Sequence, residues 1–111
     1  MPITPEQVDI WRAAPTETQT LEFKEARNQY DTDKLFIYCV AIANEGGGHL
    51  VLGVSNKPPR EVVGTKAFLS PIAIAERIFQ AVGFRVDIDE VNHPAGRVLV
   101  FSVPSRLKGT A

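Results

Sequence analysis

Three consecutive glycines, Gly46, Gly47 and Gly48, separate a helical pattern from an apolar stretch, and this order restricts the folds open to the chain. Residues 31–44 place apolar side chains at helical spacing, whereas residues 50–54 are almost continuously apolar, as in a central strand covered on both faces. A phosphate-binding glycine loop has the opposite order, because it leaves a strand and opens a helix whose free N–H groups face the phosphate. The glycines are therefore predicted to end a helix and turn the chain, with a positive φ in at least one of them.

Three stretches carry the spacing and the capping residues of helices. They span residues 4–14, 31–44 and 69–84. The expected caps are Thr4, Asp31 or Thr32, and Ser70, with Pro5 and Pro71 at first helical positions and Gly83 as a C-terminal stop. The side chains expected to face the core are Val8 with Trp11 or Ile10 in the first helix, and Ile74, Ile78 and Phe79 in the third.

Five stretches have the alternation or the β-branched content of strands. They span residues 20–24, 49–54, 61–64, 85–91 and 97–103. Together with the helices they give the order α-β-α-β-β-α-β-β. This order predicts an α+β fold in which helices pack on a mostly antiparallel sheet.

The length of 111 residues and the hydrophobic content of 44% suit one domain. Within it we expect an N-terminal helix over about residues 1–15 and a core over residues 16–106. The tail after Pro104 has no closing element. It predicts that residues 1–111 are the N-terminal piece of a longer protein.

The cysteine and histidine content indicates a cytoplasmic protein without a metal cluster of these residues. Cys39 is the only cysteine, so no disulfide can form within the chain. His49 and His93 lie far apart beside turn residues, where solvated or strand-end histidines are ordinary. The sequence contains no apolar run of membrane-spanning length and no leader at Met1, so no membrane partner is expected.

The net charge of −1 excludes the overall basic field of a dedicated nucleic-acid binder. Any role in nucleic-acid binding therefore has to depend on a local group of cationic side chains. Cationic side chains gather at Lys24 and Arg27 after the first strand, and at Lys57 and Arg60 in the turn that follows residues 49–54. These four residues are the candidate contacts to phosphate, although such groups are also common on solvated surfaces.

Two carboxylates stand five residues apart at the start of the first strand. Glu17 and Glu22 belong to the residue type that holds a hard divalent cation such as Mg²⁺ or Mn²⁺ for phosphodiester chemistry. A carboxylate beside Lys24 on an exposed strand face is ordinarily a surface pair. On composition alone, neither a metal nor another cofactor is expected.

Several of these segments together resemble the Schlafen-type Alba-like domain. They are Glu17 with residues 21–24, then residues 41–56, the "EVVG" that ends at Gly64, and the late "RVLVFSVPSR". The resemblance covers nearly all of the chain after about residue 15. In bacteria it implies the N-terminal part of longer proteins described as DNA-binding transcriptional regulators, ATP-binding proteins or helicase-related proteins.

The resemblance also implies a nuclease site, with one departure. Related animal proteins cleave RNA with three acidic residues, of which two fall on Glu17 and Glu22 and the third on Asn56. An amide is a neutral and weaker ligand for Mg²⁺ or Mn²⁺ than a carboxylate. A metal-dependent nuclease using Glu17 and Glu22 is therefore the second interpretation, and an enzyme is not expected.

The leading hypothesis is a nucleic-acid-binding module of a bacterial, cytoplasmic transcriptional regulator. It would hold the phosphate backbone of DNA or RNA weakly and in a salt-dependent way, helped by N–H groups near Gly46 to Gly48. A protein-interaction module or a homodimer is the third interpretation, which the near-neutral charge favours.

Overall fold

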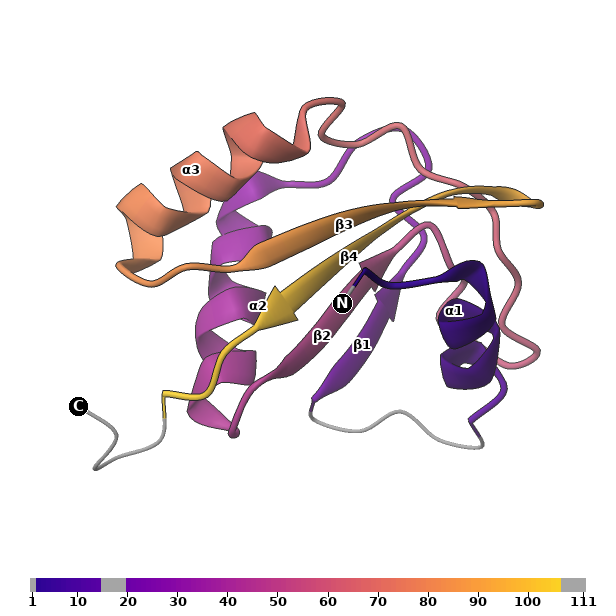
Figure 1. Ribbon diagram of the computed structural model, residues 1–111, viewed down its shortest axis with the longest axis horizontal. Helices are drawn as coiled ribbons and strands as arrows, with labels where there is room; N and C mark the ends of the chain where they lie inside the picture. Colours follow the sequence, from indigo (N-terminus) through magenta and orange to yellow (C-terminus); the bar gives the residue numbers. More distant parts are fainter. Residues whose placement is uncertain (1, 15–19, 107–111) are drawn as a thin grey trace.

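The computed structural model describes residues 2–14 and 20–106, which form one α+β layer structure (Figure 1). The elements follow the order α1 (Pro5–Arg12), β1 (Leu21–Lys24), α2 (Thr32–Asn44), β2 (Gly48–Leu52), α3 (Pro71–Val82), β3 (Asp87–His93) and β4 (Gly96–Val103). Glu17 lies outside the described residues, as do Pro15 and the tail after Arg106.

The four strands form one sheet in the order β1-β2-β4-β3. β1 and β2 run parallel and are joined by α2, with Glu22 opposite Leu50. The other two pairings are antiparallel, with Leu50 opposite Phe101 and Ile88 also opposite Phe101. The prediction of a mostly antiparallel sheet with packed helices is confirmed.

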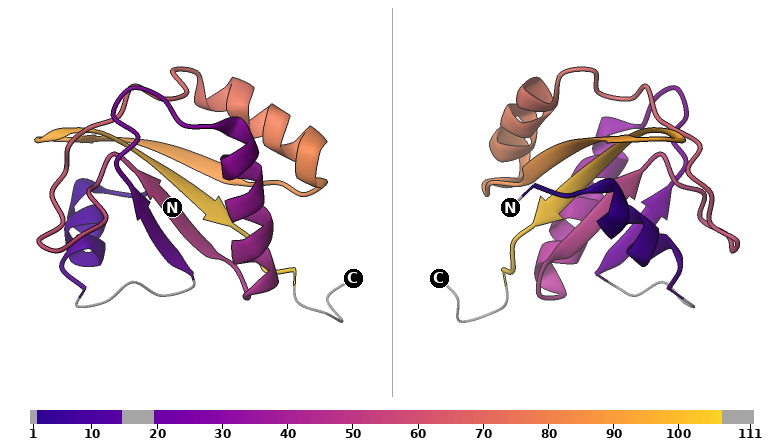
Figure 2. Two further views of the ribbon diagram at one scale, coloured as in Figure 1. Left: turned by 180° about the vertical axis from the view of Figure 1, so that it is seen from behind. Right: turned by 45° about the vertical axis from the view of Figure 1, so that its right-hand side comes forward.

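Helices cover both faces of the sheet. α1 lies in front of the sheet in Figure 1, and α2 comes forward in the view from behind (Figure 2). The core on the side of α2 and α3 includes Leu35, Ile42, Leu50, Leu52, Ile78, Leu99 and Phe101. The core on the side of α1 includes Val8, Phe23, Val51, Val91, Val98 and Val100. Because neighbouring strand residues face opposite sides, β2 contributes to both cores.

The helix starts agree with the sequence. The side chains of Thr4, Asp31 and Ser70 accept hydrogen bonds from backbone N–H groups of the first turns, as N-caps do. None of the helices in the described residues has the length and apolar character that a membrane crossing needs.

Two predictions of local structure were wrong. Phe79 is 49% exposed, since α3 buries a narrower stripe than expected, through Ile74 with Ile78. In α1, where Trp11 or Ile10 was expected to join Val8, Trp11 packs against the core and Ile10 is 66% exposed. Residues 61–64 do not form a strand of the sheet. Val62 makes a single bridge to Val54, because this segment runs back along the end of β2 without a continuing partner.

The glycine triplet ends α2 and turns the chain into β2. Gly46 and Gly47 have φ values of 104° and 90°, and the Gly47 N–H donates to the carbonyl of Ile42 at 2.9 Å. A Cβ atom on Gly47 would lie 2.9 Å from the backbone oxygen of Val103 and the backbone nitrogen of Ser105. The helix-stop interpretation of the triplet is confirmed.

Candidate nucleic-acid interface

Two loops that are distant in the sequence meet beside the C-terminal end of β1. One follows β1, and the other lies between β2 and α3. The backbone N–H of Lys66, on the segment between β2 and α3, donates to the carbonyl of Arg27 at 2.8 Å. The hydroxyl of Thr65 also donates to the carbonyl of Ala26. These bonds hold two exposed cationic residues, Arg27 and Lys66, next to each other on adjoining loops.

A pocket of about 480 Å³ lies between these loops. Its basic lining residues are Arg27, Lys66 and Arg97, and its polar ones include Asn28 and Thr65. Among the described residues that line it, none is acidic. An anion such as a phosphate group therefore meets cationic and hydrogen-bonding groups here, without a carboxylate in the wall.

Arg97 forms the rigid wall of this pocket. Its guanidinium pairs with Glu90 and donates to the carbonyls of Thr65, Ala67 and Phe68. Since each of these carbonyls belongs to the loop after β2, Arg97 fixes the shape of that loop. Arg97 shares its charge with Glu90, and Arg27 pairs with the carboxylate of Glu25 at 3.3 Å. An anion at the pocket would meet the exposed Lys66 and would compete with Glu25 for the exposed Arg27.

Both loops contain a residue in a backbone conformation that side chains disfavour. Ala26 has φ 46° and Phe68 has φ 51°. A non-glycine residue in this region costs about 1–2 kcal/mol, and such conformations concentrate at functional sites. The surrounding bonds from Thr65 and Arg97 hold the two residues in place.

Lys24, one of the predicted phosphate contacts, lies on the face of β1 that α2 covers. Its Nζ atom is 3.8 Å from Glu22 and 4.9 Å from the centre of the Tyr38 ring. Tyr30 is partly buried, and this burial, followed by the effects of Tyr38 and Glu22, raises its pKa to about 12. Lys24 is half-buried and directed toward these groups.

Arg60 was predicted to contact phosphate, but the fold uses it internally. It is 4% exposed, and its Nη1 atom donates to the carbonyl of Ala14 at 2.6 Å and to that of Arg12 at 3.3 Å. Its guanidinium carbon lies 4.8 Å from the centre of the Phe23 ring. Arg60 thus ties the loop after β2 to the end of α1, and little of its side chain remains exposed to a phosphate on the surface.

Lys57 is exposed on the same loop as Arg60, three positions earlier. The structure therefore splits the four predicted cations between three environments. Arg27 joins the pocket, Lys24 packs beside Tyr38, and Lys57 sits on the loop that Arg60 anchors to α1. The sequence prediction missed Lys66 and Arg97, because neither belongs to a motif and both reach the pocket through long-range contacts.

The three positions of the implied nuclease site are described in part. Glu22 is half-buried on β1 with its side chain near Lys24, and Asn56 is exposed on the loop after β2. Glu17 lies outside the described residues, so the convergence of Glu17, Glu22 and Asn56 stays a prediction. Within residues 2–14 and 20–106, no three His, Cys, Asp or Glu side chains gather as a metal ion requires.

The two histidines have structural contacts. His93 lies beside Asp9, with its Nε2 atom 2.8 Å from the carboxylate. The ring of His49 lies on that of Trp11, with centres 4.6 Å apart, and burial lowers the pKa of His49 while Asp89 partly offsets the shift. Both residues connect α1 to the sheet.

The sequence matches the family described as Schlafen, AlbA_2 over residues 17–110. The chain belongs to the Schlafen, AlbA_2 family. The match includes the two loops of the pocket, the glycine triplet and all four strands. No curated protein matches the sequence.

Two solved structures share the fold of this Schlafen, AlbA_2 domain. The DIP2311 protein from Corynebacterium diphtheriae superposes with a TM-score of 0.67 at 22% identity, over 90% of this chain and 24% of its own. The other is the N-terminal domain of a protein from Nitrosomonas europaea whose name relates it to the ATP-dependent DNA helicase RecG. It has a TM-score of 0.61 at 19% identity, over 91% of this chain and 72% of its own. The present chain thus spans about a quarter of the length of the Corynebacterium protein.

Proposed function

We propose that this Schlafen, AlbA_2 domain binds the phosphate backbone of nucleic acid at the pocket between the two loops. The observation that carries the proposal is the juxtaposition of Arg27 and Lys66, held by a backbone hydrogen bond beside a pocket with a basic lining. Arg97 keeps the loop in shape, and Arg27 and Lys66 supply the charge. Contacts of this kind position a protein on nucleic acid without reading its sequence.

The name of the Nitrosomonas relative, which refers to a DNA helicase, supports a role on nucleic acid. The net charge of −1 limits the electrostatic attraction to a small area, so binding is weak and sensitive to salt. In this proposal the domain is the nucleic-acid-holding part of a larger cytoplasmic protein, such as a transcriptional regulator. Lys24 and Lys57 lie outside the pocket and contribute little.

Binding can be tested by fluorescence anisotropy with a short labelled DNA duplex and a labelled single-stranded RNA. At about 50 mM salt we expect measurable binding, with a log–log salt slope of roughly −0.9 per phosphate contact on the duplex. The double variant Arg27→Glu with Lys66→Glu should lose at least about tenfold in affinity, because two attractive contacts become repulsive.

The matched control reverses two other exposed cations, Arg77 on α3 and Arg106 after β4. Arg77→Glu with Arg106→Glu changes the net charge equally but leaves the pocket intact. Equal losses in the two double variants would mean that total charge, rather than the pocket, controls binding. Undetectable binding by the unmodified domain at about 50 mM salt would contradict the proposal.

A further inference from the structure

β3 forms one edge of the sheet, because it pairs with β4 on one side and ends the strand order on the other. An edge strand of seven residues leaves a row of backbone N–H and C=O groups that can pair with another extended chain. Within the part of the chain that the structure describes, no other strand covers this edge. β3 is therefore a template for strand addition.

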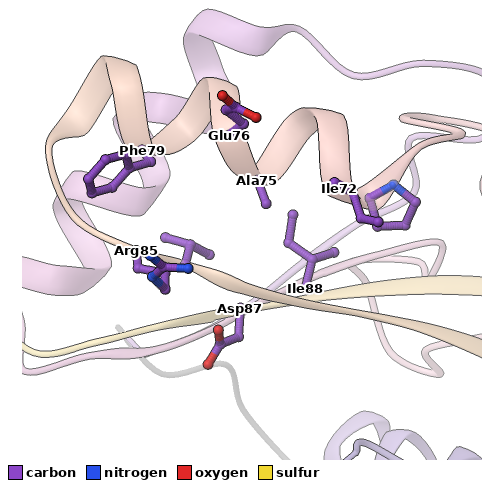
Figure 3. A pocket seen from close by; sticks show the side chains of 9 residues that line it. Ile72, Ala75, Glu76, Phe79, Arg85, Asp87 and Ile88 are labelled. Carbon is purple, nitrogen blue, oxygen red and sulfur yellow. The ribbon is translucent and has the colours of Figure 1, made fainter.

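A groove runs along the same edge, between β3 and α3 (Figure 3). It has a volume of about 480 Å³, and its apolar lining includes Ile72, Ala75, Phe79 and Ile88. Ile72 and Phe79 stand two helical turns apart on α3 and remain 83% and 49% exposed. A strand edge next to an exposed apolar helix stripe is the arrangement that binds extended peptides by strand addition.

The two faces of β3 differ in chemistry. Ile88 points toward α3, whereas Asp87 points away from it (Figure 3). Asp89 shares the face of Asp87, since side chains alternate along a strand, and the next residue on that face, Val91, packs into the core on the α1 side. An added strand would thus meet the groove on one face, where Glu76 and Arg85 stand beside the apolar side chains, and two carboxylates on the other.

The same carboxylates disfavour three antiparallel registers in which two copies of this chain could pair. In an antiparallel pair of two β3 strands centred on Asp89, Asp89 of one copy lies opposite Asp89 of the other. In a pair centred on Ile88, Asp87 of one copy lies opposite Asp89 of the other. Centring on Glu90 places Glu90 against Glu90. Like charges directly opposite each other destabilise a sheet. The partner strand is expected to carry the opposite charge.

We propose that β3 and α3 form a docking groove for an extended segment of a partner protein, in which apolar and basic residues alternate. The segment adds to the sheet as a fifth strand beside β3. Its apolar side chains fill the groove between Ile72, Phe79 and Ile88, and its lysines or arginines face Asp87 and Asp89. This surface is separate from the Arg27 and Lys66 pocket, so a protein and a nucleic acid can bind the domain together.

The test uses the whole 111-residue chain and a labelled peptide as long as β3, seven residues, in which lysine and isoleucine alternate. We expect saturable binding with a dissociation constant below about 1 mM. In NMR spectra, the backbone amides of β3 that are not bonded to β4 should shift and exchange more slowly with solvent, because they gain hydrogen bonds in the complex.

Three matched controls separate strand addition from general attraction to a basic peptide. The first is the same peptide with alternate backbone nitrogens methylated, which keeps its charge and side chains but removes hydrogen bonds. The second compares Asp87→Lys with Glu61→Lys, an equal change of charge on the loop after β2. The third compares Ile72→Ser with Ile10→Ser, an exposed isoleucine on α1.

We expect the methylated peptide, Asp87→Lys and Ile72→Ser each to lower affinity about fivefold to tenfold or more, and the two comparison variants to bind as the unmodified chain does. Circular dichroism of each variant checks that it is folded. No binding at about 1 mM peptide, equal binding of the methylated peptide, or amide shifts away from β3 would each overturn the proposal.

Discussion

The Nε2 atom of His93 lies 2.8 Å from Oδ1 of Asp9, and the Nε atom of Arg12 lies 2.8 Å from the same oxygen. One carboxylate on α1 thereby bonds both to its own helix and to the end of β3. The His93 Nδ1 atom accepts a bond from the N–H of Ala95, so Nε2 is the protonated nitrogen that donates to Asp9. The hydrogen bonds from Arg12 and then His93 lower the pKa of Asp9 below its ordinary value of 3.8.

The Asp9 contacts predict a pH dependence of stability. Because its pKa is lowered in the folded state, the carboxylate stabilises the domain above about pH 4, and this contribution disappears as the pH falls through the folded-state pKa. In urea titrations, Asp9→Asn should lose more stability relative to the unmodified chain at about pH 7 than at about pH 3. Asp87→Asn, at an exposed position, is the control and should change stability by less than about 0.5 kcal/mol.

Two glycines with similar φ separate backbone strain from steric overlap. Gly47 has φ 90° and Gly83 has φ 85°, but only a Cβ on Gly47 would meet backbone atoms, since the Gly83 position is open within 4 Å. Gly83→Ala should cost about 1 kcal/mol of unfolding free energy, and Gly47→Ala at least about 1 kcal/mol more. Equal losses would show that the contact between the glycine turn and the end of β4 can relax.

ATP should not raise the melting temperature of the unmodified chain.

Arg60 offers a test of the distinction between buried and surface cations. Arg60→Met removes the bonds to Arg12 and Ala14 and should destabilise the domain by about 1–3 kcal/mol, because two partly buried carbonyls lose their donor. Lys57→Met, on the same loop, should change stability by less than about 0.5 kcal/mol. Both folded variants should bind DNA with nearly the affinity of the unmodified chain. A large loss of DNA affinity in Arg60→Met, measured well below the melting temperature of this variant, would show that Arg60 contributes to the nucleic-acid interface.

Metal removal distinguishes phosphate binding from nuclease activity. Binding through Arg27 and Lys66 requires no metal, so EDTA should leave the affinity for DNA and RNA unchanged. With Mn²⁺, the unmodified chain should show little or no cleavage of single-stranded or structured RNA, because Asn56 supplies no charge to the implied site. Asn56→Asp restores a hard, charged ligand and is the variant in which metal binding should increase. Robust cleavage by the unmodified chain that disappears in Glu22→Gln would make the nuclease interpretation the better one.

The sequence predicted features whose causes are local. Caps such as Thr4 and Ser70 act within one helical turn, and the glycine triplet ends the helix directly before it, so their positions could be deduced from neighbouring residues. The alternation of β4 likewise identified a strand without any knowledge of its partner. The order of these elements was enough to predict the fold class.

The candidate site depends on contacts between distant residues. Arg60 is buried because carbonyls 46 and 48 positions earlier accept its hydrogen bonds, and nothing in the sequence around it indicates this. Lys66 is joined to Arg27, 39 positions earlier, by a backbone hydrogen bond. The surface stripe of α3 was also missed, since helical spacing alone does not show how far a helix projects beyond the sheet edge.

The parallel pairing of β1 with β2 has a consequence for the order of folding. β3 and β4 are joined by a short turn, whereas the parallel pairing of β1 with β2 needs the crossover through α2, and pairings across a longer separation form more slowly. β1 also occupies the outer position opposite β3, so it holds to the sheet on one side only. The loop that carries Arg27 follows directly from this strand. A nucleic acid that binds both Arg27 and Lys66 would therefore hold the end of β1 to the neighbouring loop and slow the detachment of this edge strand from the sheet.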